Sequence, residues 1–399
     1  MTITDAEQRV IDELAARGDR MQAELAEHVA IPTGKAHVAG LDAYRDILAR
    51  RLESLRARVE IIPGTPAPEW TRLPGVPAPD APPPVLVARG PGGPGPRILL
   101  AGHIDTVHDP AGDFDSMTLA ADGLHATGPG VVDMKGGVLI AVHALEALAA
   151  VGCPVNWTVS LNSDEETGSM CSAHILFDLA KEHDLGIALE PALADGSLAI
   201  ERVGSGQFRI DVHGRAAHAG REFERGVSAV NKLAEILTVI ARMARPQEGR
   251  IVNIGPIKGG AVTNAVPDHA AAWGNMRFPD AEAGAALVHQ LDALASEGDL
   301  PRVEVHHVLN RPAKPTTPAV REFADLARRT AENLGQTLPF ASTAGVCDGN
   351  ILQDAGLPTL DTLGVRGGHL HRPDEFIELA SLVERAQLLA VLLMRAVAS

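Results

Sequence analysis

Four strongly apolar runs constrain the fold of this chain most, because histidine or acidic residues follow closely after each of them. The runs end at Leu100, Leu161, Leu189 and Leu363. Strand-like runs alternate with helical patterns, such as residues 40–58 and 135–151, as in a layered α/β domain. Ligands of open α/β sheets bind beyond the carboxyl ends of the strands. The runs therefore predict one site assembled from distant parts of the chain.

The middle of the chain follows a different pattern. In order, it holds a strand-like run, a helix, two strand-like runs, a helix and a final strand, over residues 207–213, 226–244, 250–257, 269–278, 280–296 and 302–309. This β-α-β-β-α-β order is the split ferredoxin-like arrangement. After Arg311 the chain returns to helix and site-like residues. We therefore expect an inserted lid over residues 204–312 and a catalytic domain built from residues 1–203 and 313–399.

Composition excludes several classes of partner. With 51 acidic and 35 basic residues, the net charge of −16 repels nucleic acid and anionic membranes. The sequence contains neither a membrane-spanning apolar run of roughly 20 residues nor a signal peptide at its start. Its three cysteines, with no CxxC pair, argue against a disulfide scaffold. We expect a cytoplasmic protein with neither nucleic acid nor membrane as a partner.

The first candidate motif is Leu-Leu-Ala-Gly-His-Ile-Asp-Thr-Val over residues 99–107. On an extended chain, the side chains of His103 and Asp105 point the same way. A histidine can bind a metal through one ring nitrogen while a carboxylate holds the other N–H. Alone, such a pair is structural more often than functional.

Two acidic segments follow. The glycine-rich loop 126–137 contains one acid, Asp133, and lacks the GxxxxGK[ST] pattern of a phosphate loop. The two oxygens of Asp133 can bridge a pair of cations. Residues 164–166 are Asp-Glu-Glu at the end of an apolar strand, and their charges are costly unless cations neutralise them. One glutamate can bind a metal while its neighbour acts as a base; a solvated acidic turn is the alternative.

Two further segments complete the candidate ligand set. Glu190 directly follows a buried strand, and a glycine-rich loop before the final helix carries His369 and His371. Imidazoles and carboxylates together suit a pair of zinc, cobalt or manganese ions. Such a pair lowers the pKa of a bridging water and stabilises a tetrahedral oxyanion. The GxSxG and HExxH motifs of other hydrolases are missing from the sequence.

Taken in order, six motifs resemble those of the co-catalytic zinc peptidase family. They are GHIDTV, GPGVVDMKGG, SDEETGS, ALEP, GRAAHAG and HRPDE. This family includes glutamate carboxypeptidase, acetylornithine deacetylase, succinyl-diaminopimelate desuccinylase and aminoacylase. The motif sequences most resemble those of the glutamate carboxypeptidase branch. The resemblance covers nearly the whole chain. It implies a mixed-sheet catalytic domain and an inserted ferredoxin-like lid through which the chain forms a homodimer.

Carried over residue by residue, the resemblance assigns metal ligands. Asp133 bridges two ions, with a cis peptide bond to Met134. His103 and Glu190 complete the coordination of one ion, and Glu166 and His371 complete that of the other. The family's histidine ligand stands four residues before a glutamate, here Glu375, which favours His371 over His369.

The resemblance also assigns residues that act on the substrate. Asp105 supports His103, and Glu165 is the general base. His218 stabilises the oxyanion, and in dimeric relatives it comes from the partner subunit. Asn264 and Arg277 hold the substrate carboxylate; the ordinary alternatives are a turn-forming residue and a surface strand residue.

The implied activity is hydrolysis of the amide bond of an N-acyl or peptidyl amino acid with a free C-terminal carboxylate, using two divalent metal ions, zinc above cobalt or manganese. A biosynthetic deacylase such as acetylornithine deacetylase is the alternative, and a non-catalytic metal-binding protein is the distant one. Two departures leave the released amino acid open. Glutamate-selecting relatives carry a lysine shortly after the ALEP-type glutamate, whereas residues 191–200 contain none, and Cys347 stands where relatives have Ser or Thr.

Overall fold

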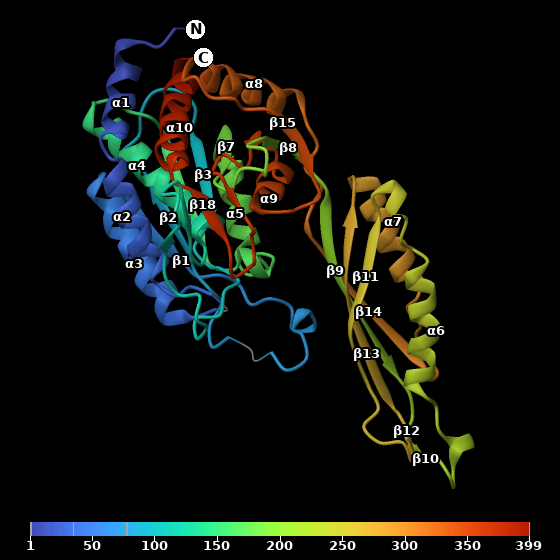
Figure 1. Ribbon diagram of the computed structural model, residues 1–399. Coiled ribbons are helices and arrows are strands. Elements are labelled where there is room, and N and C mark those ends of the chain that lie inside the picture. The colour runs from blue at the N-terminus through green and yellow to red at the C-terminus, as the bar shows by residue number, and fades with distance from the viewer. Residues whose placement is uncertain (1, 35, 77–78, 399) are drawn as a thin grey trace.

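The computed structural model describes residues 2–34, 36–76 and 79–398. Figure 1 shows a large α/β layer structure from which a narrow lid extends to one side. The central sheet has the strand order β1-β2-β6-β3-β7-β16. The strands are β1 (Arg58–Ile62), β2 (Val85–Arg89), β3 (Ile98–His103), β6 (Trp157–Asn162), β7 (Leu185–Ala188) and β16 (Thr359–Leu360).

Strand directions in this sheet explain where the site lies. β1, β2 and β6 pair antiparallel, whereas β6, β3, β7 and β16 run parallel to their neighbours. Three of the four apolar runs singled out in the sequence overlap β3, β6 and β7, and the fourth ends three residues after β16. Because parallel strands end at the same edge of a sheet, the residues that follow them are brought together.

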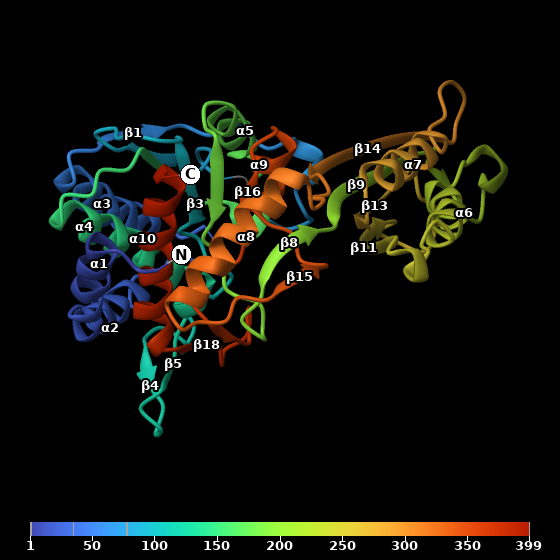
Figure 2. The same cartoon turned by 90° about the horizontal axis from the view of Figure 1, so that it is seen from above.

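Helices cover both faces of the central sheet (Figure 2). One face packs against α1 (Asp5–Ala15), α2 (Gly18–Val29), α3 (Val38–Ser54), α4 (Gly137–Ala150), α8 (Pro318–Asn333) and α10 (Ala380–Ala398). The other packs against α5 (Ala173–Lys181) and α9 (Asp348–Asp354). Successive residues of β3 alternate between the two hydrophobic clusters, since Ile98 and Leu100 join one and Leu99 and Ala101 the other. A strand that is buried on both faces is uniformly apolar, and this apolar run is what predicted β3 from the sequence.

The lid has the predicted β-α-β-β-α-β order. Its elements are β9 (Gly204–His213), α6 (Ala229–Ala241), β11 (Ile251–Gly259), β13 (His269–Phe278), α7 (Ala281–Asp292) and β14 (Arg302–Arg311). The strand order β11-β13-β9-β14 is antiparallel throughout and ferredoxin-like. The predicted fold class, a mixed sheet with this inserted unit, is confirmed. We propose that residues 204–312 form the insert and that 1–203 with 313–399 form the catalytic domain.

A second connection joins the lid to the catalytic part. The proline-rich segment before β2 contains the short helix η1 (Glu69–Thr71), whose Trp70 ring stacks on His306 of β14 with 5.9 Å between ring centroids. The indole Nε1 of Trp273 donates to the Trp70 carbonyl at 3.0 Å. This proline-rich segment therefore braces the lid.

Smaller elements complete the fold. A small sheet has the order β17-β18-β5-β4, and two pairs are formed by β8 with β15 and by β10 with β12. Their bounds are β4 (Thr118–Leu119), β5 (His125–Thr127), β8 (Leu198–Arg202), β10 (Ala217–His218), β12 (Ala265–Val266), β15 (Phe340–Thr343), β17 (Gly367–Gly368) and β18 (Phe376–Glu378). Among the helices of the described residues, none is long and apolar enough to cross a membrane.

Candidate active site

The carboxyl edge of the central sheet positions most of the predicted site residues. His103 is the last residue of β3, and Glu165 with Glu166 begins the short helix η3 (Glu165–Thr167) after β6. Glu190 follows β7 by two residues. Asp133 lies in the irregular turn η2 (Val131–Gly136) before α4, and its peptide bond to Met134 is cis.

Asp133 is the centre of the cluster. Its Oδ1 lies 3.3 Å from His103 Nε2, and its Oδ2 lies 3.5 Å from His371 Nε2. Beyond the two imidazoles, Glu190 Oε1 is 3.9 Å from His103 Nε2, and Glu166 Oε2 is 3.2 Å from His371 Nε2. The five residues predicted as metal ligands are thus brought together, with one histidine facing each oxygen of Asp133.

His369 lies elsewhere, although it shares the loop of His371. Its Nδ1 is 2.9 Å from Asp374 Oδ2, and its ring packs against the edge of Phe376. The imidazole that faces Asp133 and Glu166 is that of His371.

The electrostatics of the cluster favour cations. Burial raises the pKa of Glu165 to about 7, raises that of Glu166, and raises that of Glu190 well above its usual range. Asp133 Oδ1 is buried, and no described residue donates a hydrogen bond to it. Buried carboxylates at this density are stable as anions only beside positive charge. The donor set, imidazole nitrogen and carboxylate oxygen, therefore fits divalent cations.

Distance alone does not distinguish Glu165 from Glu166 as a ligand. Single ligand atoms of His103, Glu165 and Glu190 lie within 4.8 Å of one another, and so do those of His103, Asp133 and Glu166. Their partners differ, however. Glu165 Oε1 accepts a hydrogen bond from Arg311 Nη2 at 3.0 Å, whereas Glu166 faces His371. Glu165 is therefore held away from His371 by a cation of the protein itself.

Asp105 supports the site in two ways. Its backbone carbonyl, rather than its carboxylate, is the hydrogen-bond partner of His103 Nδ1, at 3.0 Å, with the carboxylate Oδ1 at 3.5 Å. The carboxylate instead accepts the backbone N–H groups of Glu165 at 3.3 Å and Glu166 at 3.0 Å. Asp105 therefore fixes the orientation of the acidic pair as well as that of the imidazole.

Arg311 is a site residue that the sequence analysis did not single out. It ends β14 and is only 1% exposed. Besides Glu165, its guanidinium donates to Ser169 Oγ at 2.7 Å and to the Gly168 carbonyl at 3.1 Å, and it lies 3.1 Å from Asp348 Oδ1. An arginine at the end of an apolar strand was the available signal. Its partners lie more than a hundred residues away or in another element, so the sequence did not reveal its role.

Glu375 and His108 form a second missed pair. The Glu375 carboxylate accepts backbone N–H groups of Gly130, Val132 and Asp133 at 3.1, 2.9 and 3.0 Å. His108 Nε2 lies 2.6 Å from its Oε2. In the sequence, Glu375 stands out only as a marker for His371, and no motif includes His108. Glu375 holds the loop that presents Asp133.

The structure separates the predicted lid residues. Arg277, which contacts Ser205 near the hinge, is close enough to Arg311 that burial and this second guanidinium lower its pKa. His218 and Asn264 lie together at the far tip of the lid, where Ala219 N donates to the Asn264 carbonyl at 3.0 Å (Figure 1). Within one chain, these two residues do not reach the Asp133 cluster.

Cys347 does not have the surroundings of a nucleophile. The thiol is buried, and burial raises its pKa well above the ordinary value. Its Sγ lies 3.1 Å from Asp361 Oδ2 and accepts the Gly349 N–H at the start of α9. The residue thus caps a helix, as a buried structural cysteine does.

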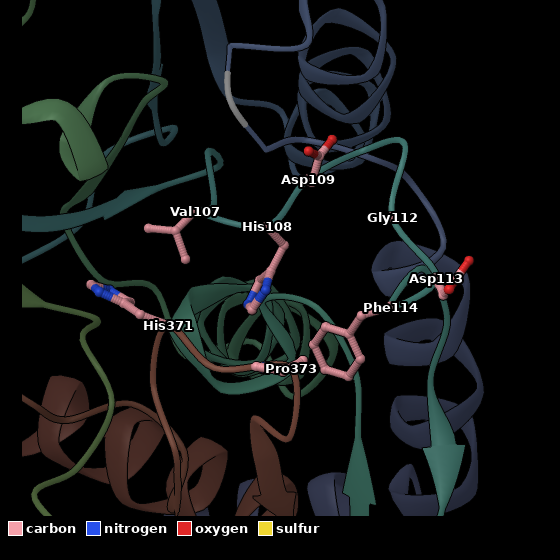
Figure 3. A pocket seen from close by; sticks show the side chains of 8 residues that line it. All are labelled: Val107, His108, Asp109, Gly112, Asp113, Phe114, His371 and Pro373. Carbon is pink, nitrogen blue, oxygen red and sulfur yellow. The ribbon is translucent and has the colours of Figure 1, made fainter. Parts of the chain in front are cut away.

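An open cavity of about 780 Å³ adjoins His371. It is lined by Val107, His108, Asp109, Gly112, Asp113, Phe114, His371 and Pro373 (Figure 3). The loop after β3 supplies most of these residues, so the cavity lies between two segments that also carry site residues.

Comparisons with known proteins agree with this geometry. The sequence profile described as "Peptidase family M20/M25/M40" matches residues 99–395. The chain is 27% identical over 307 residues to carboxypeptidase G2 of Pseudomonas sp. (strain RS-16), covering 75% of this chain and 74% of the relative. It is 30% identical over 319 residues to succinyl-diaminopimelate desuccinylase of Methylorubrum populi, covering 72% of this chain and 79% of the relative.

A solved structure shares the fold. The YXEP protein of Bacillus subtilis, described as a dinuclear metal binding peptidase, superposes with a TM-score of 0.65 at 16% identity, covering 96% of this chain and 97% of that one.

The contacts of Glu375 lead to a prediction about metal affinity. Glu375→Gln replaces an acceptor oxygen with an amide NH₂ that cannot accept from the Asp133 loop. We expect the affinity for Zn²⁺ to fall roughly 10- to 100-fold, as measured by calorimetry. The matched control is Glu378→Gln, since the side-chain partner of Glu378 is Arg366 and not that loop. Equal affinities in the two variants would contradict the role assigned to Glu375.

Proposed function

The chain belongs to peptidase family M20/M25/M40 and is a metal-dependent hydrolase of peptides or N-acyl amino acids, and we propose that it acts as a glutamate carboxypeptidase-like amidohydrolase. Its substrate is an N-acyl or peptidyl amino acid with a free C-terminal carboxylate. The observation that carries this proposal is the position of Asp133 between two imidazoles, with a second carboxylate behind each of them.

We assign the metal ligands accordingly. Asp133, His103 and Glu190 hold one divalent ion, and Asp133, Glu166 and His371 hold the other, with zinc preferred over cobalt or manganese because two of the ligands are imidazoles. When bound, the ions supply Lewis acidity that polarises the scissile carbonyl and stabilises negative charge on its oxygen.

Glu165 moves the protons. It removes a proton from the attacking water as the water oxygen bonds to the amide carbon, and it passes that proton to the leaving amine as the C–N bond breaks. Burial raises its pKa to about 7, which matches a group that both accepts and donates near neutral pH. The hydrogen bond from Arg311 fixes which of its oxygens faces the substrate.

The lid binds the carboxylate end of the substrate. Arg277 lies at the hinge end of the lid and can form a bidentate pair with a carboxylate. His218 and Asn264 lie at the far tip, so we assign them to the active site of a second copy in a homodimer. His218 then stabilises the oxyanion. We place this enzyme in the cytoplasm, as the free cysteines lead us to expect.

Two alternatives differ in testable ways. A biosynthetic deacylase such as acetylornithine deacetylase uses the same machinery. The similarity to a desuccinylase supports this alternative, in which the enzyme selects one particular acyl group. A non-catalytic metal-binding protein requires a lost base or ligand, yet Glu165 and all the proposed ligands are present.

The first test is Glu165→Gln in zinc-loaded protein. Removing the base lowers kcat by about 10³-fold while the metal content, measured by mass spectrometry, stays at the wild-type level. Glu182→Gln, on the surface beside Arg89, is the matched control. Retained turnover in Glu165→Gln rules out the mechanism.

A panel of substrates tests the proposed specificity on the wild-type protein. It contains N-acetyl, N-benzoyl, folyl and dipeptidyl forms of Glu, Asp, Orn, Met and aromatic amino acids. A strong preference for N-acetylornithine over every acyl glutamate would favour the biosynthetic deacylase.

The second prediction concerns the shared active site. Glu165→Gln and His218→Ala are each inactive alone, because each lacks one group. Mixed in equal amounts and allowed to exchange subunits, they form dimers in which one site has both groups intact. Activity then returns to about a quarter of the wild-type level. No recovery, with exchange verified by tagged subunits, would show that His218 acts within its own chain or not at all.

A further inference from the structure

We propose that the cavity beside His371 binds the acyl group of the substrate and selects an uncharged aromatic acyl group over a dicarboxylic one. This inference rests on the proposed function, since it concerns the same site. It addresses the choice that the two named relatives leave open, between a carboxypeptidase and a desuccinylase.

The position of the cavity follows from the two flanks of the Asp133 cluster. Arg277 and Arg311 lie on the flank of Glu165, toward the lid hinge. His371 lines the cavity and faces Glu166. The two halves of an N-acyl amino acid extend in opposite directions from the scissile amide. When Arg277 holds the carboxylate, the acyl group therefore extends toward His371 and the cavity.

The walls of the cavity suit a flat apolar group. Val107, Phe114 and Pro373 supply apolar surface, and Figure 3 shows the rings of His108 and Phe114 close together. These two rings lie edge to face, with 5.1 Å between centroids. Because Glu375 holds His108 at 2.6 Å, the aromatic wall is ordered before a ligand arrives. An aromatic acyl group gains favourable ring contacts there.

The charges around the cavity disfavour an anionic acyl group. Asp109 and Asp113 line it, and none of its described lining residues is Lys or Arg. The adjacent Arg372 is paired bidentately with Asp374 at 2.9 Å, and Lys135 is buried behind the loop with its Nζ donating to the Ile31 carbonyl at 2.7 Å. The distal carboxylate of a succinyl group therefore finds no lysine or arginine among the described residues that line the cavity, and two of those residues are acidic.

Binding to an inactive protein tests the inference without turnover. Zinc-loaded Glu165→Gln is titrated by calorimetry with the N-benzoyl, N-acetyl and N-succinyl forms of one amino acid. We expect N-benzoyl to bind about tenfold more tightly than N-succinyl. Adding Phe114→Ala to this protein should lower the benzoyl-to-acetyl affinity ratio about tenfold. Leu124→Ala, at an exposed position in the neighbouring hairpin, is the matched control and should leave the ratio as it was.

Charge reversal at the cavity provides the second arm. Asp113→Lys should raise the succinyl-to-benzoyl ratio about threefold, an effect that weakens with added salt. The acyl-site assignment is overturned if N-succinyl binds more tightly than N-benzoyl. It is also overturned if neither Phe114→Ala nor Asp113→Lys changes the affinity ratios. These outcomes are separable from failure of the proposed function. If the zinc-loaded wild type hydrolyses nothing in the panel, the proposed function is refuted. If it hydrolyses substrates while the affinity ratios stay unchanged in the variants, only the acyl-site assignment is refuted.

Discussion

Repulsion among buried carboxylates is the constraint on which the rest of this structure depends. Asp133, Glu165, Glu166 and Glu190 converge at one edge of the sheet, and burial together with neighbouring carboxylates raises the pKa of the three glutamates. Proteins tolerate such a cluster only when positive charge or directed N–H groups offset it. Two imidazoles and the buried Arg311 provide part of that offset, and the divalent ions proposed for this site would provide the rest.

The same local device appears twice around the cluster. Asp105 accepts backbone N–H groups of the acidic pair, and Glu375 accepts those of the Asp133 loop. In each case, a carboxylate outside the proposed ligand set fixes the backbone that carries a ligand. Neither loop takes part in the regular hydrogen bonding of a β-sheet. The hydrogen bonds from backbone N–H groups to these two carboxylates therefore fix the positions of the proposed ligands in its place. Glu375 also contacts His108, which links the Asp133 loop to the wall of the cavity beside His371.

Separation between lid and cluster has a structural cause. The lid joins the catalytic part through the adjoining ends of β9 and β14, so only residues near those ends reach the cluster. Arg311 and Arg277 lie there, whereas His218 and Asn264 lie at the opposite tip. The Trp70 brace against His306 and Trp273 adds a second point of attachment midway along the lid sheet. An active site that draws on both ends of the lid therefore needs a second copy of the chain.

The sequence by itself determined the layered α/β class, the ferredoxin-like insert and the residue types at the strand ends. Those features depend on local periodicity and on motifs such as Gly-His-Ile-Asp-Thr-Val, which a linear reading can recover. The four-residue spacing to Glu375 also favoured His371 over His369, and His371 is the imidazole that faces Asp133 and Glu166. Only the tertiary structure decided that Arg311 holds Glu165 and that His108 and Glu375 join the loops around the site. Each of these facts is a contact between elements far apart in the chain, and it depends on how the strands pack edge to edge, which no local pattern encodes.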